Sequence, residues 1–301
     1  MTLNSGHQHR EQLGKSAAGL TALAWLCQRP GADEQVWLER FAQGLVTLGG
    51  ARAEPGQVLR AGEWLSFHRP PWDEPDDVPL AFTVLHEDAD LVAVGKPSGL
   101  PTMPAGGVYL EHTLLRLVQQ RFPGATPLHR LGRATSGLVL FARTGAARAE
   151  GARALREREV RKVYRALASG QVQPQRFTIE APIGEVPWAP LGMLWASSPA
   201  GRPSKSHVLL LEQREGSALV EVEIETGRPH QIRIHLANAG HPLVGDPLYG
   251  PGGLPIEGSG AVPGDGGYLL HAGRMELLHP RSGQRLVLEC PPPEALQVGG
   301  K

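Results

Sequence analysis

The chain has 301 residues, of which 41% are hydrophobic and 20% are charged, so it is long and apolar enough for about two domains with substantial cores. Its 30 basic and 30 acidic residues balance, and a net charge of zero taken alone argues against a nucleic-acid partner. The two cysteines, Cys27 and Cys290, exclude a disulfide framework, and neither belongs to a cluster with metal-ligand spacing.

The first 30 residues could contain a signal peptide for secretion. Residues 1–15 are polar and predict a flexible tail. The apolar stretch 17–27 resembles the core of a signal peptide, but no cleavage site of small residues follows it, and a short amphipathic helix is the alternative that we favour. Since no stretch approaches the roughly 18 apolar residues of a membrane helix, we expect a cytoplasmic protein that does not enter a membrane.

Two further segments precede the main part of the chain. Residues 16–70 predict a small α+β unit, in which two helical stretches are followed by short strands around tight turns such as Gly49-Gly50. Residues 70–80 are rich in proline and acidic side chains, which break both helical and strand periodicity, so we interpret them as a linker.

Residues 81–295 mix strands and helices without regular alternation, which favours the α+β class over a doubly wound sheet. Alternation or continuous apolar runs predict strands, and 3.6-residue spacing predicts helices. The expected strands are 82–86, 91–95, 137–142, 220–224, 268–271 and 285–289, and Tyr164 is expected to lie in a further strand within 161–170. The expected helices are 113–122 and 230–239.

The neutral total hides a charge asymmetry. Residues 31–110 carry 12 acids and 5 bases, whereas residues 121–170 carry 11 bases and 3 acids. Ten of these 11 bases are arginines, whose planar guanidinium suits bidentate phosphate contacts. The cluster could be an ordinary solvated face, but it flanks an unusually polar loop, and we therefore favour a phosphate-binding face.

Three segments are more polar than structural loops usually are. They are HRLGRATSG (129–137), RKVYRALASG (161–170) and the histidine- and arginine-containing stretch 226–250. Each also has a structural interpretation, because a strand tyrosine is usually core and histidines often cap helices or pack. As zinc ligands, His230, His235 and His241 lack the spacing of known patterns, so we expect no metal.

Together these segments resemble the active-site motifs of the RluA-type family of RNA pseudouridine synthases. The resemblance runs from about residue 80 to 293 and includes KPSGL (96–100), LREREVRKVYRA (155–166), GHPLVGDPLYG (240–250) and LLHAGRMELLHP (269–280). It implies a mixed, mostly antiparallel sheet for residues 81–295. Residues 16–70 resemble, more weakly, an αL-type RNA-binding module, although they are acidic where that module is basic.

The resemblance implies that the chain isomerises uridine to pseudouridine in ribosomal or transfer RNA, without a cofactor, after the target base has been flipped out of its stack. By position, Tyr164 would stack on the uracil and help remove the C5 proton, and Arg233 would pair with the catalytic aspartate. The residues that would contact the RNA are His129, Arg130, Arg133, Thr135, Arg153, Arg156, Arg161, Arg228, His230 and Gln231.

The catalytic aspartate itself is missing, because Gly132 stands where the family motif H-R-L-D has its acid. Arg233 would then lose its partner, and Asp246 belongs to another part of the family pattern and is no evident replacement. Two hypotheses remain open: a synthase that uses a displaced carboxylate, and an inactive relative that binds RNA. For both we expect a monomer whose partner is RNA. An acidic oxygen within about 4 Å of the Arg233 guanidinium would favour the first hypothesis.

Overall fold

The computed structural model describes residues 2–29, 32–104 and 107–300, and the chain divides into two units, Met1–Asp76 and Asp77–Lys301. The first unit contains a four-stranded antiparallel sheet in the order β2-β5-β3-β4 and two helices. Its elements are β2 (His7–Gln12), α1 (Ala22–Leu26), α2 (Glu34–Ala42), β3 (Val46–Leu48), β4 (Ala51–Arg52) and β5 (Trp64–Arg69). Apolar residues such as Leu26, Trp37 and Leu65 form its core.

The prediction of a flexible tail over residues 1–15 is wrong. Strand β2 pairs antiparallel with β5, from His7 opposite Arg69 to Gln12 opposite Trp64. The short strand β1 (Thr2–Leu3) pairs with β6 (Asp73–Glu74), which lies inside the predicted linker. These strands are polar because they lie at sheet edges, where most of their side chains remain exposed and no apolar alternation marks them.

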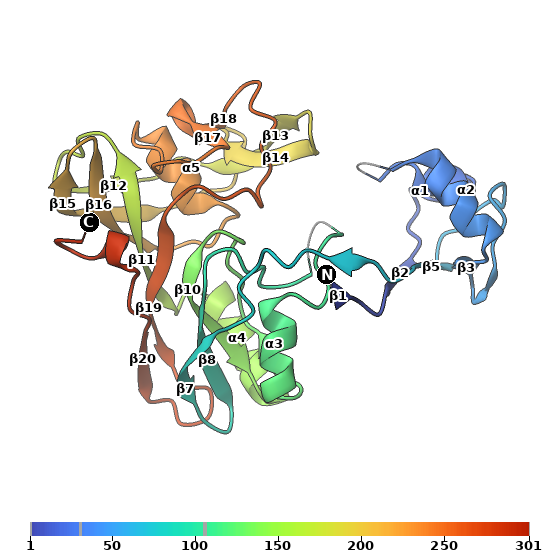
Figure 1. The fold of residues 1–301 in the computed structure, drawn as a ribbon, viewed down its shortest axis with the longest axis horizontal. Helices are drawn as coiled ribbons and strands as arrows, with labels where there is room; N and C mark the ends of the chain where they lie inside the picture. The colour runs from blue at the N-terminus through green and yellow to red at the C-terminus, as the bar shows by residue number, and fades with distance from the viewer. Residues whose placement is uncertain (1, 30–31, 105–106, 301) are drawn as a thin grey trace. The chain divides into compact units, whose positions relative to one another are not determined.

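The second unit is built on a ten-stranded sheet, shown in Figure 1. Its main path runs β12 (Arg176–Ile179), β15 (Ser206–Arg214), β16 (Ser217–Ile224), β11 (Arg161–Ser169), β19 (Leu270–Leu278), β10 (Ser136–Ala142), β8 (Leu91–Lys96) and β7 (Thr83–Glu87). Strand β20 (Arg285–Glu289) pairs with β19, and β9 (Thr126–Pro127) pairs with β10. All pairs are antiparallel except β10 with β19, so the mixed, mostly antiparallel α+β fold is confirmed.

Alternation along β8 and β10 places apolar side chains on both faces of the sheet. Val92, Val94, Val139 and Phe141 belong to the core that includes Leu114 and Val118 of α3 (Leu114–Arg121). Leu91, Ala93, Leu138 and Leu140 belong to the core that includes Ala147 and Ala154 of α4 (Gly145–Arg156). The two helices therefore bury opposite faces of the same strands, which fixes the loop 129–135 that leads into β10.

A third layer of short elements packs around α5 (Gln231–Asn238). It contains the hairpin of β13 (Ile183–Trp188) and β14 (Gly192–Ser197), the pair of β17 (Tyr249–Gly250) and β18 (Leu254–Pro255), and the turn η1 (Pro251–Gly253). A last turn, η2 (Glu294–Leu296), follows the sheet. Seven residues of α5 are buried, so side chains on several sides of this helix face protein.

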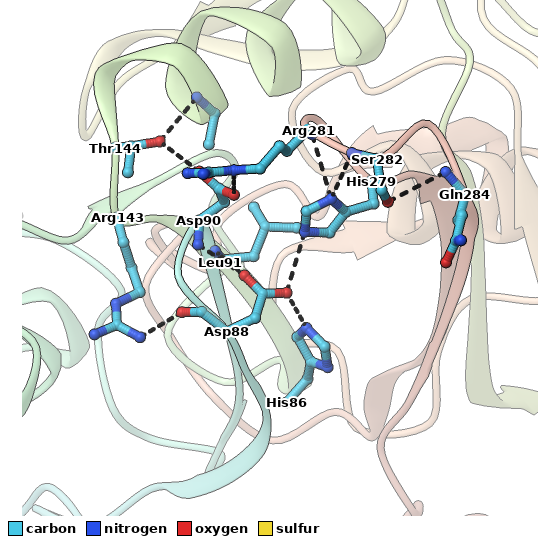
Figure 2. Close-up of polar contacts among 11 residues, drawn as sticks. His86, Asp88, Asp90, Leu91, Arg143, Thr144, His279, Arg281, Ser282 and Gln284 are labelled. Atoms are coloured by element: carbon cyan, nitrogen blue, oxygen red, sulfur yellow. Dashed lines mark hydrogen bonds and ion pairs between the residues drawn. The ribbon is translucent and has the colours of Figure 1, made fainter.

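A polar cluster ties the β7–β8 turn to the β19–β20 turn and to the start of α4 (Figure 2). Asp88 contacts His86 Nε2 at 2.6 Å and His279 Nε2 at 3.2 Å. Asp90 accepts two hydrogen bonds from Arg281, at 2.5 and 2.8 Å, and one from Thr144 at 3.0 Å. Segments almost 200 residues apart in sequence are thereby joined at one end of the sheet.

The predicted helices and strands of residues 81–295 correspond to β7, β8, α3, β10, β11, β16, α5, β19 and β20. Strand β19 continues to Leu278, well beyond the predicted 268–271, and strands β9, β12–β15, β17 and β18 were not predicted. The stretch 17–27 contains helix α1, which has only five residues. None of the helices in the described part of the chain is long and apolar enough to cross a membrane.

Candidate active site

A cleft of about 460 Å³ opens beside β11, near the end of α4. It is lined by His129, Arg130, Leu155, Arg156, Arg158, Val160, Lys162, Tyr164 and residues 224–228. Five of the lining side chains are arginine or lysine and one is acidic, Glu225, whose pKa is lowered chiefly by a hydrogen bond from His207. A chain of zero net charge thus presents a locally basic cleft, as a phosphate-binding surface requires.

Tyr164 belongs to the wall of this cleft and lies in the middle of the sheet. It is opposite Val222 of β16 and Ala272 of β19, and only 8% of its surface is exposed. Burial raises the pKa of its hydroxyl to about 12. The phenol is therefore protonated near pH 7, a state suited to stacking and hydrogen-bond donation. It would have to lose its own proton before it accepted one.

His129 anchors the polar loop to the sheet. Its Nε2 atom accepts a hydrogen bond from the Leu140 backbone at 3.1 Å. Burial and, to a smaller extent, the nearby Lys162 lower the pKa of His129 to about 4, so the imidazole is neutral at pH 7. The ring serves as an acceptor for β10, and Arg130 follows it on the cleft wall.

Side chains of the segment 96–102 donate hydrogen bonds to backbone carbonyls of residues 131–134 and fix their position. Lys96, 2% exposed, donates from Nζ to the carbonyls of Pro97, Leu100 and Arg133 at 2.7–3.0 Å, and burial lowers its pKa to about 7. Ser98 donates to the Ala134 carbonyl at 2.6 Å. The Arg133 side chain itself bonds the Gly264 carbonyl and the Tyr109 hydroxyl, both at 2.9 Å. These hydrogen bonds hold the loop in place. Arg133, a predicted RNA contact, forms hydrogen bonds within the protein instead.

Gly132 has room for a side chain. A Cβ atom there would lie 3.5 Å from Tyr268 Oη and 3.6 Å from Thr135 Oγ1, which is ordinary van der Waals contact, and its backbone is outside the left-handed region. Thr135 is buried and its hydroxyl lies 3.4 Å from that of Tyr268. Thr135, a predicted RNA contact, therefore packs against Tyr268 below the loop.

Arg233 is paired, contrary to the prediction that it would lack an acidic partner. Its Nε and Nη2 atoms donate to Asp246 Oδ2 and Oδ1, each at 2.7 Å, and the two side chains are 2% and 0% exposed. Burial alone would lower the pKa of Arg233, but these bonds raise it above its usual value. The guanidinium lies over the ring of Tyr268 at 4.2 Å, and so Gly132 and Arg233 share one neighbour.

The start of α5 is fixed by an internal network. Gln231, 3% exposed, bonds the Thr226 hydroxyl at 2.7 Å and the Arg228 backbone at 3.1 Å. His230 Nδ1 lies 2.7 Å from the Tyr249 hydroxyl, and burial lowers its pKa to about 4. Among the predicted RNA contacts of this segment, Arg228 lines the cleft, whereas Gln231 supports the cleft wall.

The arginines after residue 148 fall into two groups. Arg153 is paired with Glu150, Glu157 and Glu159. Arg161 bonds Glu223 and Glu276, both at 2.8 Å. Arg156, with 72% of its side chain exposed, lines the cleft and makes a single long contact with the Glu157 carboxylate, at 3.9 Å, among the described residues. The sequence placed Arg153, Arg156 and Arg161 in one phosphate-binding group, but two of the three are held by carboxylates of the chain.

Metal-ligating side chains gather at one place in the described residues, where one atom each of Asp88, Asp90 and His279 lies within 4.8 Å of the others (Figure 2). Arg281 already supplies a positive charge to Asp90 there. His230, His235 and His241, the other candidates from sequence, bond three different partners: Tyr249, Ser206 and the carbonyl of Ser169.

Comparison with known proteins assigns the larger unit. A family model described as RNA pseudouridylate synthase matches residues 90–238. An uncharacterised RNA pseudouridine synthase of Synechocystis is 44% identical over 268 residues, which cover 88% of this chain and 91% of that protein. The chain belongs to the RluA-type family of RNA pseudouridine synthases.

Other relatives of this synthase chain agree. The ribosomal large subunit pseudouridine synthase D of Nitrosomonas europaea is 35% identical over 86% of this chain and 76% of its own length. The solved structure of human RNA pseudouridylate synthase domain containing 1 is 28% identical, with a TM-score of 0.57, over 75% of this chain and 90% of that chain.

Sequence reasoning missed several residues that shape the site of this pseudouridine synthase. Lys162 precedes Tyr164 by two positions on the same strand face, a period-two signal that was available. Arg158 was counted in the basic segment but not singled out. Tyr268 lies beside both Gly132 and Arg233. It does not belong to any of the three polar segments, so the sequence did not indicate that it is part of the site.

Proposed function

We propose that the basic cleft beside Tyr164 binds structured ribosomal or transfer RNA and receives one flipped uridine, which the protein isomerises to pseudouridine. The observation that carries this is the position of the buried Tyr164 in the wall of a cleft with five basic side chains and one acidic one. In the reaction the N1–C1′ bond breaks, the uracil turns, a C5–C1′ bond forms, the hydrogen of C5 leaves as a proton to water, and N1 takes up a proton from water.

Because Gly132 occupies the position of the family's aspartate, another acidic side chain must supply the carboxylate for this reaction. Asp246 is the acid on Arg233, but it also accepts backbone hydrogen bonds from Leu248 and Tyr249 at 2.9 and 3.2 Å. With a fully buried side chain and four hydrogen bonds, Asp246 must break contacts before it reaches a ribose.

Tritium release from RNA that contains [5-³H]uridine tests the proposal, because isomerisation exchanges the C5 hydrogen with water. We expect release by the native protein and its loss in Tyr164→Phe, a change that keeps the ring and removes the hydroxyl. Release that persists in Tyr164→Phe removes this hydroxyl from the reaction. No release by the native protein on ribosomal and transfer RNA transcripts refutes the synthase proposal.

A second candidate, an inactive family member that binds RNA, is favoured by the missing side chain at residue 132 alone. Because a Cβ fits there with its nearest contacts at 3.5 and 3.6 Å, Gly132→Asp should fold. A silent native protein that binds RNA and gains release as Gly132→Asp supports this second candidate. We also propose that residues 16–70 form an RNA-binding-like module, and that the chain acts as a monomer without a metal ion.

A further inference from the structure

Two residues other than glycine have a left-handed backbone in the described part of the chain, and both lie at the candidate site. They are Arg158, with φ of 62°, and His230, with φ of 54°. This conformation is unfavourable for side chains with a Cβ and persists where the surrounding structure enforces it, often at functional sites. His230 begins the helix that carries Arg233, and Arg158 lines the cleft.

The turn at Arg158 normally favours glycine. Helix α4 ends at Arg156, with Glu157 as its C-cap. The Arg158 N–H bonds the Leu155 carbonyl at 3.4 Å, and the Glu159 N–H bonds the Ala154 carbonyl at 2.9 Å. This pair of bonds defines a Schellman turn, whose left-handed residue is usually glycine because no Cβ is crowded there. Arginine at this position therefore costs conformational free energy that the fold alone does not require.

The side chain of Arg158 differs from those of its charged neighbours. Arg153 and Arg161 are tied to carboxylates, whereas in the described residues the exposed side chain of Arg158 makes no hydrogen bond or ion pair. It acts on Glu225 only at longer range, where its charge helps to lower the pKa of that carboxyl. It shares the cleft with Arg130, Lys162 and Tyr164. An unpaired guanidinium beside the tyrosine is available to a ligand with an anionic group.

We propose that Arg158 is a substrate-positioning residue, which binds the RNA phosphate adjacent to the uridine that stacks on Tyr164. The strained turn is retained because it directs this guanidinium into the cleft. This inference rests on the proposed function and adds to it the residue that fixes the register of the RNA backbone.

The test compares the stability of Arg158→Gly with its RNA affinity. If Arg158 had only a structural role, its replacement would not raise stability and lower RNA affinity together. In Arg158→Gly the urea midpoint of the larger unit should rise, since glycine relieves the strain. The Kd for a fluorescein-labelled RNA hairpin with a uridine-rich loop should rise about tenfold, and the slope of log Kd against log salt should fall by roughly 0.7–0.9. In tritium release, KM should rise while kcat changes little.

Two variants serve as controls. Arg158→Lys keeps the charge and should restore the salt slope, with affinity between those of the other two proteins. Arg148→Ala removes an exposed charge from the same helix outside the cleft and should leave both measurements unchanged.

An Arg158→Gly protein that is less stable than the native one, or that binds the hairpin with native affinity and salt slope, overturns the inference. Native protein that does not bind the hairpin in a salt-dependent way overturns both this inference and the proposed function. If the native protein binds the hairpin, Arg158→Gly shows the reduced salt slope, and neither protein releases tritium, the Arg158 site is supported and the synthase activity is refuted.

Discussion

Replacement of Asp246 by asparagine should strongly destabilise the larger unit, because it leaves the buried guanidinium of Arg233 without its counter-charge. The two side chains are 2% and 0% exposed and share two hydrogen bonds of 2.7 Å. The asparagine oxygen still accepts from the Leu248 and Tyr249 backbone and from Arg233 Nη2, but its amide group turns a donor toward the Nε donor of Arg233.

The magnitude follows from the burial of the pair. Removal of one partner from a buried ion pair costs about 3–5 kcal/mol, a large part of a typical stability of about 5–15 kcal/mol. With a urea dependence of about 2 kcal/mol per molar, the unfolding midpoint should fall by roughly 1.5–2.5 M. Urea unfolding followed by far-ultraviolet circular dichroism measures this shift.

Two further variants sharpen the test. Glu159→Gln breaks one of the three carboxylate contacts of the half-buried Arg153, and because Glu159 itself is exposed, the midpoint should stay unchanged. Arg233→Met combined with Asp246→Asn removes the stranded charge, and it should be more stable than Asp246→Asn alone. If Asp246→Asn unfolds at the native midpoint, or if the double variant is the less stable of the two, the buried pair does not hold this unit together.

The other predictions concern charge and pH. Because Arg153 is held by three glutamates and Arg156 lines the cleft, Arg156→Ala should weaken RNA hairpin binding in a filter assay, and Arg153→Ala should not. Burial opposes ionisation of Asp88, but hydrogen bonds from His86 and two backbone N–H groups hold its pKa at about 2. Its contribution to stability is present above the unfolded value of about 3.9 and is lost as pH falls toward 2, so Asp88→Asn should flatten the acid limb of thermal stability. His129, with a pKa of about 4, should show no imidazole titration by NMR between pH 5 and 8, and its contribution to stability should decline as pH falls from its unfolded value toward 4. Titration of that ring near pH 6.5 would contradict its burial.

The sheet of the larger unit could be predicted where burial imposes a period. Strand β16 alternates valine and glutamate, and β10 is a continuous apolar run, so both strands can be predicted from their local sequence. Strand β2 cannot be predicted in this way, because its partner β5 lies more than 50 residues away and its own side chains are mostly polar and exposed. Edge strands of this kind depend on pairing that a local pattern does not contain.

The candidate site was predictable as a group of motifs but not as a set of contacts. A count of arginines between 121 and 170 gives the charge of the segment and says nothing of which guanidinium groups are free. For Arg153 a local signal existed, since Glu150 and Glu157 stand three and four residues away on the same helix face. For Arg161 none existed, because Glu223 and Glu276 reach it from two neighbouring strands.

The absence of an acid at residue 132 made Arg233 look unpaired, and the physical rule that buried cations are paired was the better guide. Asp246 supplies the pair from the loop after α5, with both oxygens on the guanidinium. An aspartate introduced at residue 132 would have to share Arg233 with it across the Tyr268 ring. The role of Gly132 is therefore coupled to Asp246, and Gly132→Asp should restore part of the urea midpoint that Asp246→Asn loses, because the new carboxylate offers Arg233 a counter-charge.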